Sequence, residues 1–254
     1  SHVNNELGTV NDPRSLSAAL KKESPQTRLF LDGVQAVGRL KITSELWRGL
    51  SGYSVSGHKI NGPKGIGLLI YDSRLSLAPQ IHGGRQQFGV RSGTLPVPLI
   101  LGLAETIKIA VDRLEETQAH LRKLNRRLVE GLRNLSEKSP NLEIRFNSLP
   151  EDDLVRQSPA MVNFSFFPVE GEVLLHHLEE KGIFVGLGSA CSAHSREPSK
   201  ILTGIGLSVD EARCSLRVSF GRQNTVDEMD RFLEEFSLAY ETLFPTFSQD
   251  LSRK

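Results

Sequence analysis

Lys59 lies in an unusual stretch of the sequence, residues 54–67, which reads "SVSGHKINGPKGIG". For a lone lysine in a glycine loop, the structural interpretation is the commoner one. A lysine that acts as an amine nucleophile, however, must lose its proton and approach a carbonyl at a fixed angle. It then needs a partly desolvated position and a backbone that turns sharply behind it, which glycine permits. The stretch is therefore a candidate site of amine chemistry.

A second group of polar residues follows the apolar segment "RLFLD" at residues 28–32. Asp32 ends this segment and Gln35 comes three residues later, where open α/β sheets collect ligands. Asp32 alone could equally cap a following helix. Beside its lysine, pyridoxal phosphate requires a carboxylate that keeps the pyridine nitrogen protonated and an amide near a ring oxygen. Lys59, Asp32 and Gln35 could supply these three groups. Ser56 and His58 would then face the phosphate.

The two cysteines of the chain have different surroundings in the sequence. Cys191 lies in "GLGSACSAHSREPS", a loop of small and polar residues in which His194 and Arg196 favour a thiolate. Cys214 lies in "EARCSLRV" beside a predicted strand, and a free cysteine there is usually buried. We expect Cys191 to be a nucleophile and Cys214 to be structural. So few cysteines also indicate a reducing compartment, and with no signal peptide we expect a cytoplasmic protein.

The elements that must position these residues alternate between strands and helices, which predicts an α/β fold. Residues 99–135 predict one very long helix, or two joined end to end, and residues 226–244 a last helix with Thr225 as N-cap. A further helix is predicted over 171–181, closed by Gly182, and a short one before the strand that leads to Lys59. Strands are predicted at residues 28–32, 65–71, 142–147, 161–167, 183–188 and 215–221, with a return strand in the latter part of 44–57. We expect two domains, 1–105 and 106–254.

Composition excludes several classes of function. The 254 residues include 31 Lys plus Arg and 30 Asp plus Glu, so a net charge of +1 gives no reason to expect nucleic acid or an anionic membrane as partner. No apolar run approaches the roughly 20 residues that span a bilayer. The sequence contains neither CxxC nor HExxH, and the adjacent His176 and His177 diverge on a helix, so no metal site is predicted.

Five blocks in a fixed order carry a resemblance to a known family: "HVNNELG", "LDGVQAVGRL", "SGHKINGPKGIG", "GVRSGTLPVP" and "GSACSAHSREPS". They resemble the NifS/IscS-type cysteine desulfurases, which are fold-type I pyridoxal-phosphate enzymes of the class V aminotransferase family. The resemblance runs nearly end to end. It implies an α/β fold in which residues 1–105 form part of the cofactor-binding large domain and 106–254 form the small domain with the Cys191 loop.

The resemblance also implies a reaction, in which L-cysteine becomes L-alanine and the sulfur passes to an enzyme persulfide for iron–sulfur or thiocofactor synthesis. Cys191 would accept the sulfur, and its long loop matches the NifS/IscS subgroup and suggests a mobile arm that delivers sulfur to an acceptor such as an iron–sulfur scaffold. By position, the other residues would act as follows: Lys59 as Schiff-base lysine, Asp32 as pyridinium partner, Gln35 on the ring hydroxyl, Ser56 and His58 on the phosphate, Asn5 near ring and substrate, Arg217 on the substrate carboxylate, and Thr94 on the phosphate of the partner's cofactor in a homodimer.

The chain departs from the family pattern in two ways. Arg85, Gln87 and Phe88 stand where relatives usually carry Gly, Glu and Arg. An upstream segment with an Ala-Thr phosphate-binding turn and a ring-stacking histidine is absent from these residues, so we expect a fragment or a site completed by another chain. Two alternatives remain: a selenocysteine lyase or cysteine sulfinate desulfinase, and a non-catalytic binding or scaffold subunit.

Overall fold

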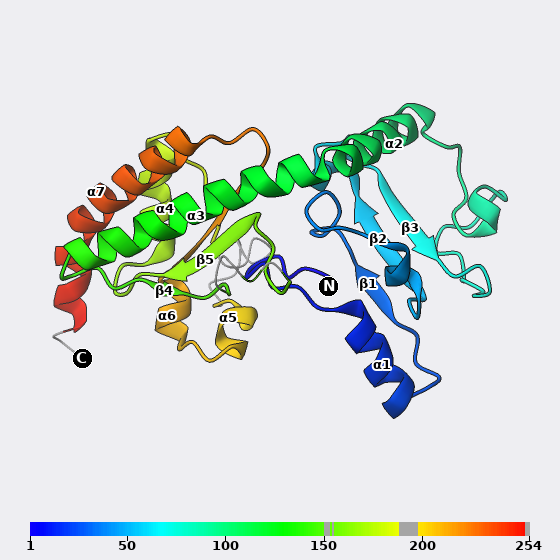
Figure 1. Ribbon diagram of the computed structural model, residues 1–254, viewed down its shortest axis with the longest axis horizontal. Coiled ribbons are helices and arrows are strands. Elements are labelled where there is room, and N and C mark those ends of the chain that lie inside the picture. Colours follow the sequence, from blue (N-terminus) through cyan, green and yellow to red (C-terminus); the bar gives the residue numbers. More distant parts are fainter. Residues whose placement is uncertain (150–152, 154, 188–197, 252–254) are drawn as a thin grey trace. The chain divides into compact units, whose positions relative to one another are not determined.

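The structure is a computed structural model, and it describes residues 1–149, 153, 155–187 and 198–251 (Figure 1). The chain divides into two compact units. The first contains Ser1–Val3 and Asn11–Glu115, and the second contains Asn4–Val10 and Glu116–Lys254. A short segment near the amino terminus thus belongs to the second unit although both its neighbours in sequence belong to the first.

The first unit is built on a mixed three-stranded sheet of order β1-β2-β3. Its strands are β1 (Phe30–Asp32), β2 (Gly52–Ser56) and β3 (Gly67–Tyr71). β1 pairs with β2 in parallel, so both strands end at the same edge, whereas β3 is antiparallel to β2. Tyr53 and Val55 of β2 pack with Leu103 of helix α2 (Val97–Asp112) in a small apolar core. The unit also contains helix α1 (Pro13–Glu23) and short 3-10 helices at Ser44–Trp47, Gly57–Ile60 and Gln87–Gly89.

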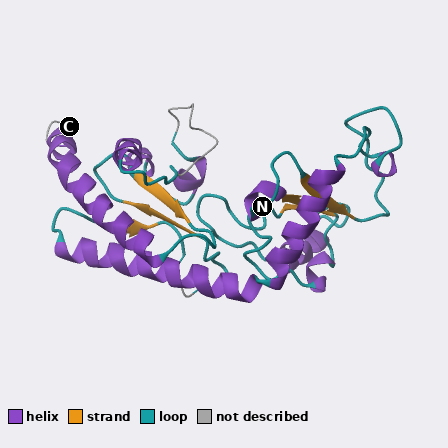
Figure 2. Ribbon diagram, turned by 90° about the horizontal axis from the view of Figure 1, so that it is seen from above, coloured by secondary structure: helices purple, strands orange, loops and turns teal. Residues whose placement is uncertain are grey.

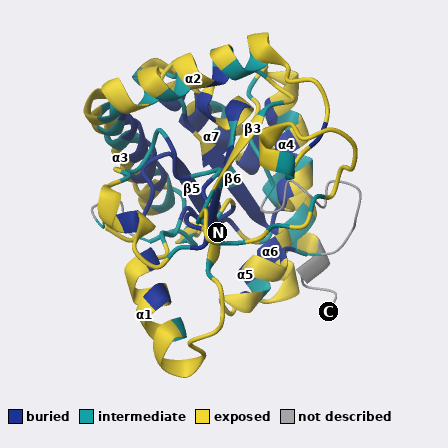
Figure 3. Cartoon of the chain, turned by 90° about the vertical axis from the view of Figure 1, so that its right-hand side faces the viewer, coloured by how far each residue is buried: buried dark blue, intermediate teal, exposed yellow. Residues whose placement is uncertain are grey.

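The second unit packs helices onto an antiparallel sheet of order β4-β5-β6. The strands are β4 (Arg145–Phe146), β5 (Met161–Ser165) and β6 (Ser215–Ser219), and the main helices are α3 (Leu114–Lys138), α4 (Gly171–Glu180) and α7 (Val226–Leu251). Leu121, Leu124, Leu128 and Leu132 recur at helical spacing on α3, and all four are buried in a core that β5, β6, α4 and α7 share. Figure 2 shows these helices beside the sheet, and Figure 3 colours their buried residues dark blue.

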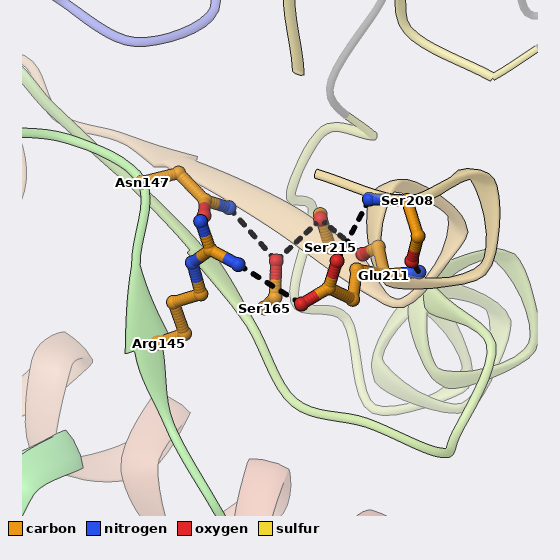
Figure 4. A network of polar contacts seen from close by, with 6 residues as sticks. All are labelled: Arg145, Asn147, Ser165, Ser208, Glu211 and Ser215. Carbon is orange, nitrogen blue, oxygen red and sulfur yellow. Dashed lines mark hydrogen bonds and ion pairs between the residues drawn. The ribbon is translucent and has the colours of Figure 1, made fainter. Parts of the chain in front are cut away.

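Two short helices, α5 (Lys200–Gly204) and α6 (Val209–Arg213), complete the second unit. α6 begins in a capping box in which Ser208 and Glu211 each bond the other's backbone N–H. Arg145 of β4 donates to the same Glu211 carboxylate at 2.9 Å (Figure 4). Ser215, the first residue of β6, bonds the Ser165 hydroxyl and donates to the Glu211 carbonyl. This network fixes α6 against the sheet.

Most predicted elements are confirmed, with one correction. The chain between 183 and 188 forms no strand in its described part, and only Gly186 makes an isolated bridge, to Arg217. Of the two arrangements predicted for the long helical region, the structure has two helices joined end to end, because Arg113 leaves the helical backbone conformation with φ −101° and ψ 17°. Thr225 caps α7 as predicted, since its hydroxyl accepts from the Glu228 N–H at 3.2 Å. Within the described residues, no helix is long and apolar enough to cross a membrane.

Candidate functional site

The first group of candidate residues lies at the carboxyl ends of the parallel strands β1 and β2. Asp32 is the last residue of β1 and is in register with Ser54 of β2. Its carboxylate accepts from the Val34 N–H at 2.9 Å and from the Ser54 hydroxyl at 3.4 Å. The turn after β1 carries Gln35, which is half-buried. Ligands collect at such strand ends because the polypeptide leaves the sheet there and its side chains remain accessible.

Ser56, His58 and Lys59 follow at the end of β2. Ser56 is the last residue of the strand, and the next residues form the 3-10 helix Gly57–Ile60. The Ser56 hydroxyl and the His58 Nδ1 are 2.8 Å apart, so the two side chains face the same space. The Lys59 carbonyl accepts from the Arg39 guanidinium at 3.2 Å, which fixes the backbone of the lysine. Both His58 and Lys59 are exposed.

The glycines around Lys59 are required by close backbone contacts. A Cβ on Gly57 would lie 2.9 Å from the Pro63 carbonyl oxygen, and one on Gly62 would lie 3.0 Å from the Gly57 carbonyl oxygen. Gly65 has a φ of +82°, which disfavours any side chain. The sharp turn predicted behind Lys59 is confirmed. Its partly desolvated position is not, because the side chain of Lys59 is exposed to solvent in this structure.

Sequence reasoning missed the support beneath this group. Tyr53 lies one residue before Ser54, and its buried hydroxyl is 2.8 Å from the Nδ1 of His2. The His2 N–H donates to the Asp32 carbonyl at 2.7 Å, so both residues hold the end of β1 in place. Burial lowers the pKa of His2, which favours the neutral imidazole as a partner of the tyrosine hydroxyl. A Cβ on Gly33 would overlap the Tyr53 ring at 2.0 Å, and the glycine of "LDG" is the signal that could have revealed this contact.

The second group lies in the second unit, around Arg217. Arg217 is the middle residue of β6, and its Nη1 donates to the carbonyl of Asn5 at 2.8 Å. Arg217 also exchanges two backbone hydrogen bonds with Gly186, of 3.0 and 2.7 Å. The guanidinium lies over Gly186, where a Cβ would approach its Nη2 within 2.8 Å. These contacts give the guanidinium a fixed place, and its planar fork suits a carboxylate.

A buried carboxylate near Arg217 was not anticipated from the sequence. Glu6 is only 6% exposed and accepts a hydrogen bond from the hydroxyl of Ser199. Burial raises the pKa of Glu6, while the Ser199 hydrogen bond and the charge of Arg217 lower it, and burial is the largest effect. The side chain of Asn4, two residues before Glu6, accepts from the N–H groups of Glu6 and Leu7, which shapes the turn.

The structure describes only one of the two cysteines. Cys191 falls in residues 188–197, outside the described part of the chain. Cys214 is buried and free, as predicted, and burial raises the pKa of its thiol to about 12. Such a thiol is not a nucleophile at neutral pH, because the thiolate is the reactive form.

The remaining predicted positions lie on the surface of the first unit. Thr94 is exposed in the loop that leads to α2. Of the three departures from the family pattern, Phe88 is 94% exposed, and both Gln87 and Phe88 have positive φ angles, of 50° and 57°. Arg85 is exposed as well. The structure therefore places this loop at the surface of the first unit.

The chain is similar in sequence to known proteins. Residues 1–232 match the family described as aminotransferase class-V. The chain is 40% identical over 232 residues to a protein of Klebsiella pneumoniae named cysteine desulfurase IscS, and the match covers 90% of this chain and 54% of that relative. This chain thus spans about half the length of the curated relative.

Solved structures show the same likeness in fold. One named NifS-like protein has a TM-score of 0.82 at 31% identity, and the alignment covers 95% of this chain and 60% of that one. A NifS-like protein from Rickettsia africae has a TM-score of 0.78 at 29% identity, and the alignment covers 94% of this chain and 60% of the other.

Proposed function

From the premise that the chain belongs to the aminotransferase class-V family, we propose that it carries the cofactor and substrate residues of a pyridoxal-phosphate-dependent cysteine desulfurase. The observation that carries the proposal is the convergence of Asp32, Ser56, His58 and Lys59 at the carboxyl ends of two parallel strands. The Klebsiella relative, named cysteine desulfurase, supports the choice of substrate.

The polar residues at the ends of β1 and β2 fit this cofactor chemically. Asp32 would hold a proton on the pyridine nitrogen, and Gln35 would bond the ring oxygen. The paired Ser56 and His58 would bind the phosphate, and the Lys59 amine would attach the cofactor. When bound, pyridoxal phosphate supplies an electron sink for the bonds at the substrate α-carbon.

Substrate binding is assigned to the second unit. Arg217 would bind the carboxylate of L-cysteine with two parallel N–H···O bonds, and Asn5, whose carbonyl Arg217 already contacts, would lie beside the substrate. The same group suits L-selenocysteine or cysteine sulfinate, since all three substrates carry an α-carboxylate. The group that accepts the sulfur or selenium atom would therefore discriminate between these three substrates.

Cys191 would accept the sulfur. Its thiolate attacks the substrate sulfur, the carbon–sulfur bond breaks, and the bonding electron pair remains with the carbon that becomes the methyl group of alanine. Cys191 then holds a persulfide, which a sulfur-acceptor protein such as an iron–sulfur scaffold would consume. We further propose a homodimer in which the exposed Thr94 contacts the phosphate of the cofactor bound by the partner subunit.

The test is to trap the cofactor and to follow the sulfur. Borohydride reduction of the protein loaded with pyridoxal phosphate should fix the label on the peptide containing Lys59, and Lys59→Ala should remove both the label and the turnover. Lys64→Ala, in the same glycine-rich stretch, is the matched control and should retain both.

After one turnover with L-cysteine, mass spectrometry should find the added sulfur on Cys191. A label that persists in Lys59→Ala would overturn the assignment, and turnover in Cys191→Ser would favour a lyase that needs no protein thiol.

A further inference from the structure

Glu6 is the one buried carboxylate near Arg217, among the described residues, to which the reaction above gives no task. A buried carboxylate is unfavourable unless hydrogen bonds or opposite charge compensate it. Glu6 has both kinds of compensation, from the Ser199 hydroxyl and from the charge of Arg217. The fold therefore buries a carboxylate that is unfavourable on its own, and the two residues that compensate it, Ser199 and Arg217, lie far from Glu6 in the sequence.

The Ser199 hydroxyl joins Glu6 to helix α5. It donates to the Glu6 carboxylate and also accepts the N–H groups of Ile201 and Leu202, at 3.2 and 3.1 Å, as the N-cap of α5. All hydrogen-bonding capacity of this hydroxyl is thus used. Leu7, the residue after Glu6, packs with Leu202 in the same small apolar cluster. Ser199 is fixed by Glu6 from one side and by α5 from the other.

The residue before Glu6 is joined to Arg217. The Asn5 carbonyl accepts from the Arg217 guanidinium at 2.8 Å, and the Arg217 backbone bonds Gly186 in both directions. Contacts therefore run from Gly186 through Arg217, Asn5 and Glu6 to Ser199. Gly186 and Ser199 flank in sequence the residues 188–197 that include Cys191.

We propose that Glu6 is a positioning residue that fixes Ser199 and, through the adjoining Asn5 carbonyl, the guanidinium of Arg217. The inference rests on the proposed function, because it assigns the substrate carboxylate to Arg217. Glu6 does not touch the reacting atoms. It holds the Arg217 guanidinium and Ser199, which follows residues 188–197 in the sequence, at fixed positions relative to each other. A bound substrate then meets a defined geometry.

The experiment measures alanine formation from L-cysteine by the protein loaded with pyridoxal phosphate. Glu6→Ala and Ser199→Ala should each lower kcat about tenfold, since small misplacements of positioned groups have effects of this size or larger. The double variant should be no slower than either single variant, because both changes remove one interaction. Glu6→Gln should recover most of the rate, since its amide oxygen can still accept from Ser199. Glu180→Ala, an exposed carboxylate on α4, is the matched control and should behave as the parent protein.

A second readout is independent of turnover. Hydrogen exchange at the Ile201 and Leu202 amides, which donate to Ser199, should accelerate in Glu6→Ala but not in Glu180→Ala. Additive losses in the double variant, no rescue by glutamine, or unchanged exchange would overturn the proposal. If the parent protein has no desulfurase activity, the proposed function fails, while the exchange data still decide whether Glu6 holds Ser199.

Discussion

The thiol of Cys214 illustrates how far the surroundings of a single residue decide its chemistry. Its residue is 3% exposed, and its backbone carbonyl accepts from the Phe166 N–H beside the sheet. Burial is the main reason that its pKa is raised to about 12, and the nearby charges of Glu170 and Asp210 act in the same direction. The native fold therefore favours the neutral thiol well above the ordinary pKa of 9.0.

This shift predicts a specific dependence of stability on pH. Above pH 9 the unfolded chain loses the Cys214 proton while the folded chain keeps it until about pH 12, so stability should fall as the pH rises through this interval. The free energy of unfolding, measured with urea between pH 7 and pH 11, should decline more steeply for the parent protein than for Cys214→Ala. Burial also raises the pKa of Tyr53, but Tyr53 is present in both proteins and its contribution cancels in the comparison. Parallel curves would contradict the assigned shift.

Single residues of the site were predictable from the sequence where their function depends on local order. Asp32 and Ser56 are the last residues of their strands and His58 follows two positions after Ser56, and a strand end is visible in the sequence as an apolar run that stops. Glu6 and Ser199 were not predictable, because 193 positions separate the two residues and no motif in the sequence around either one indicates their contact. The same holds for His2 and Tyr53, which are 51 positions apart.

At the scale of elements, the errors have physical causes. The apolar run at 183–188 has strand composition, but in its described part it makes only the Gly186 bridge to β6. The apolar periodicity continues on both sides of Arg113, so the sequence predicted either one long helix or two joined end to end, and the structure has two. Helix α1 was overlooked although Asp12 and Pro13 are a recognisable start, with the Asp12 carboxylate accepting from two N–H groups.

The capping box of α6 leads to a prediction about this short helix. Ser208→Ala should lower the free energy of unfolding by about 1 kcal/mol, because the Glu211 N–H loses its acceptor at the N-cap. The Ser208 N–H and Arg145 hold the pKa of Glu211 below its ordinary value, so their contribution should be lost as the pH falls through that lowered pKa. Urea denaturation at pH 7 and pH 4 measures both effects, with Ser139→Ala, outside the network of Figure 4, as control. Equal stabilities of Ser208→Ala and the parent protein would show that the box contributes nothing.

For the whole molecule, the fold class predicted from the sequence is confirmed. The match to the aminotransferase class-V family and the likeness to NifS-like structures agree with the mixed α/β architecture. The assignment of Asn4–Val10 to the second unit lay beyond sequence reasoning, since it depends on contacts of these residues with distant ones, such as the backbone hydrogen bond from Val10 to Arg156. No local pattern in "HVNNELG" reports such a contact.

The sheet of the first unit predicts how the 254-residue chain behaves in solution. β3 is an edge strand among the described strands, and Leu68, Leu69 and Ile70 are all more than a third exposed, so both faces of this strand present apolar surface to solvent. An exposed apolar edge strand is a template for association, because its unpaired backbone groups can bond another chain. The chain alone should therefore self-associate with rising concentration.

A charge on this strand should suppress that association. Leu69 is 47% exposed, so Leu69→Lys should alter the free energy of unfolding by no more than about 0.5 kcal/mol while it hinders pairing along β3. Sedimentation velocity over a range of concentrations should show a smaller mean mass for Leu69→Lys than for the parent chain. Leu238→Lys, on α7 with a comparably exposed side chain, is the matched control, and it should associate as the parent chain does. If both variants reduce the mass equally, added charge alone is responsible and β3 is not the surface through which the chains meet.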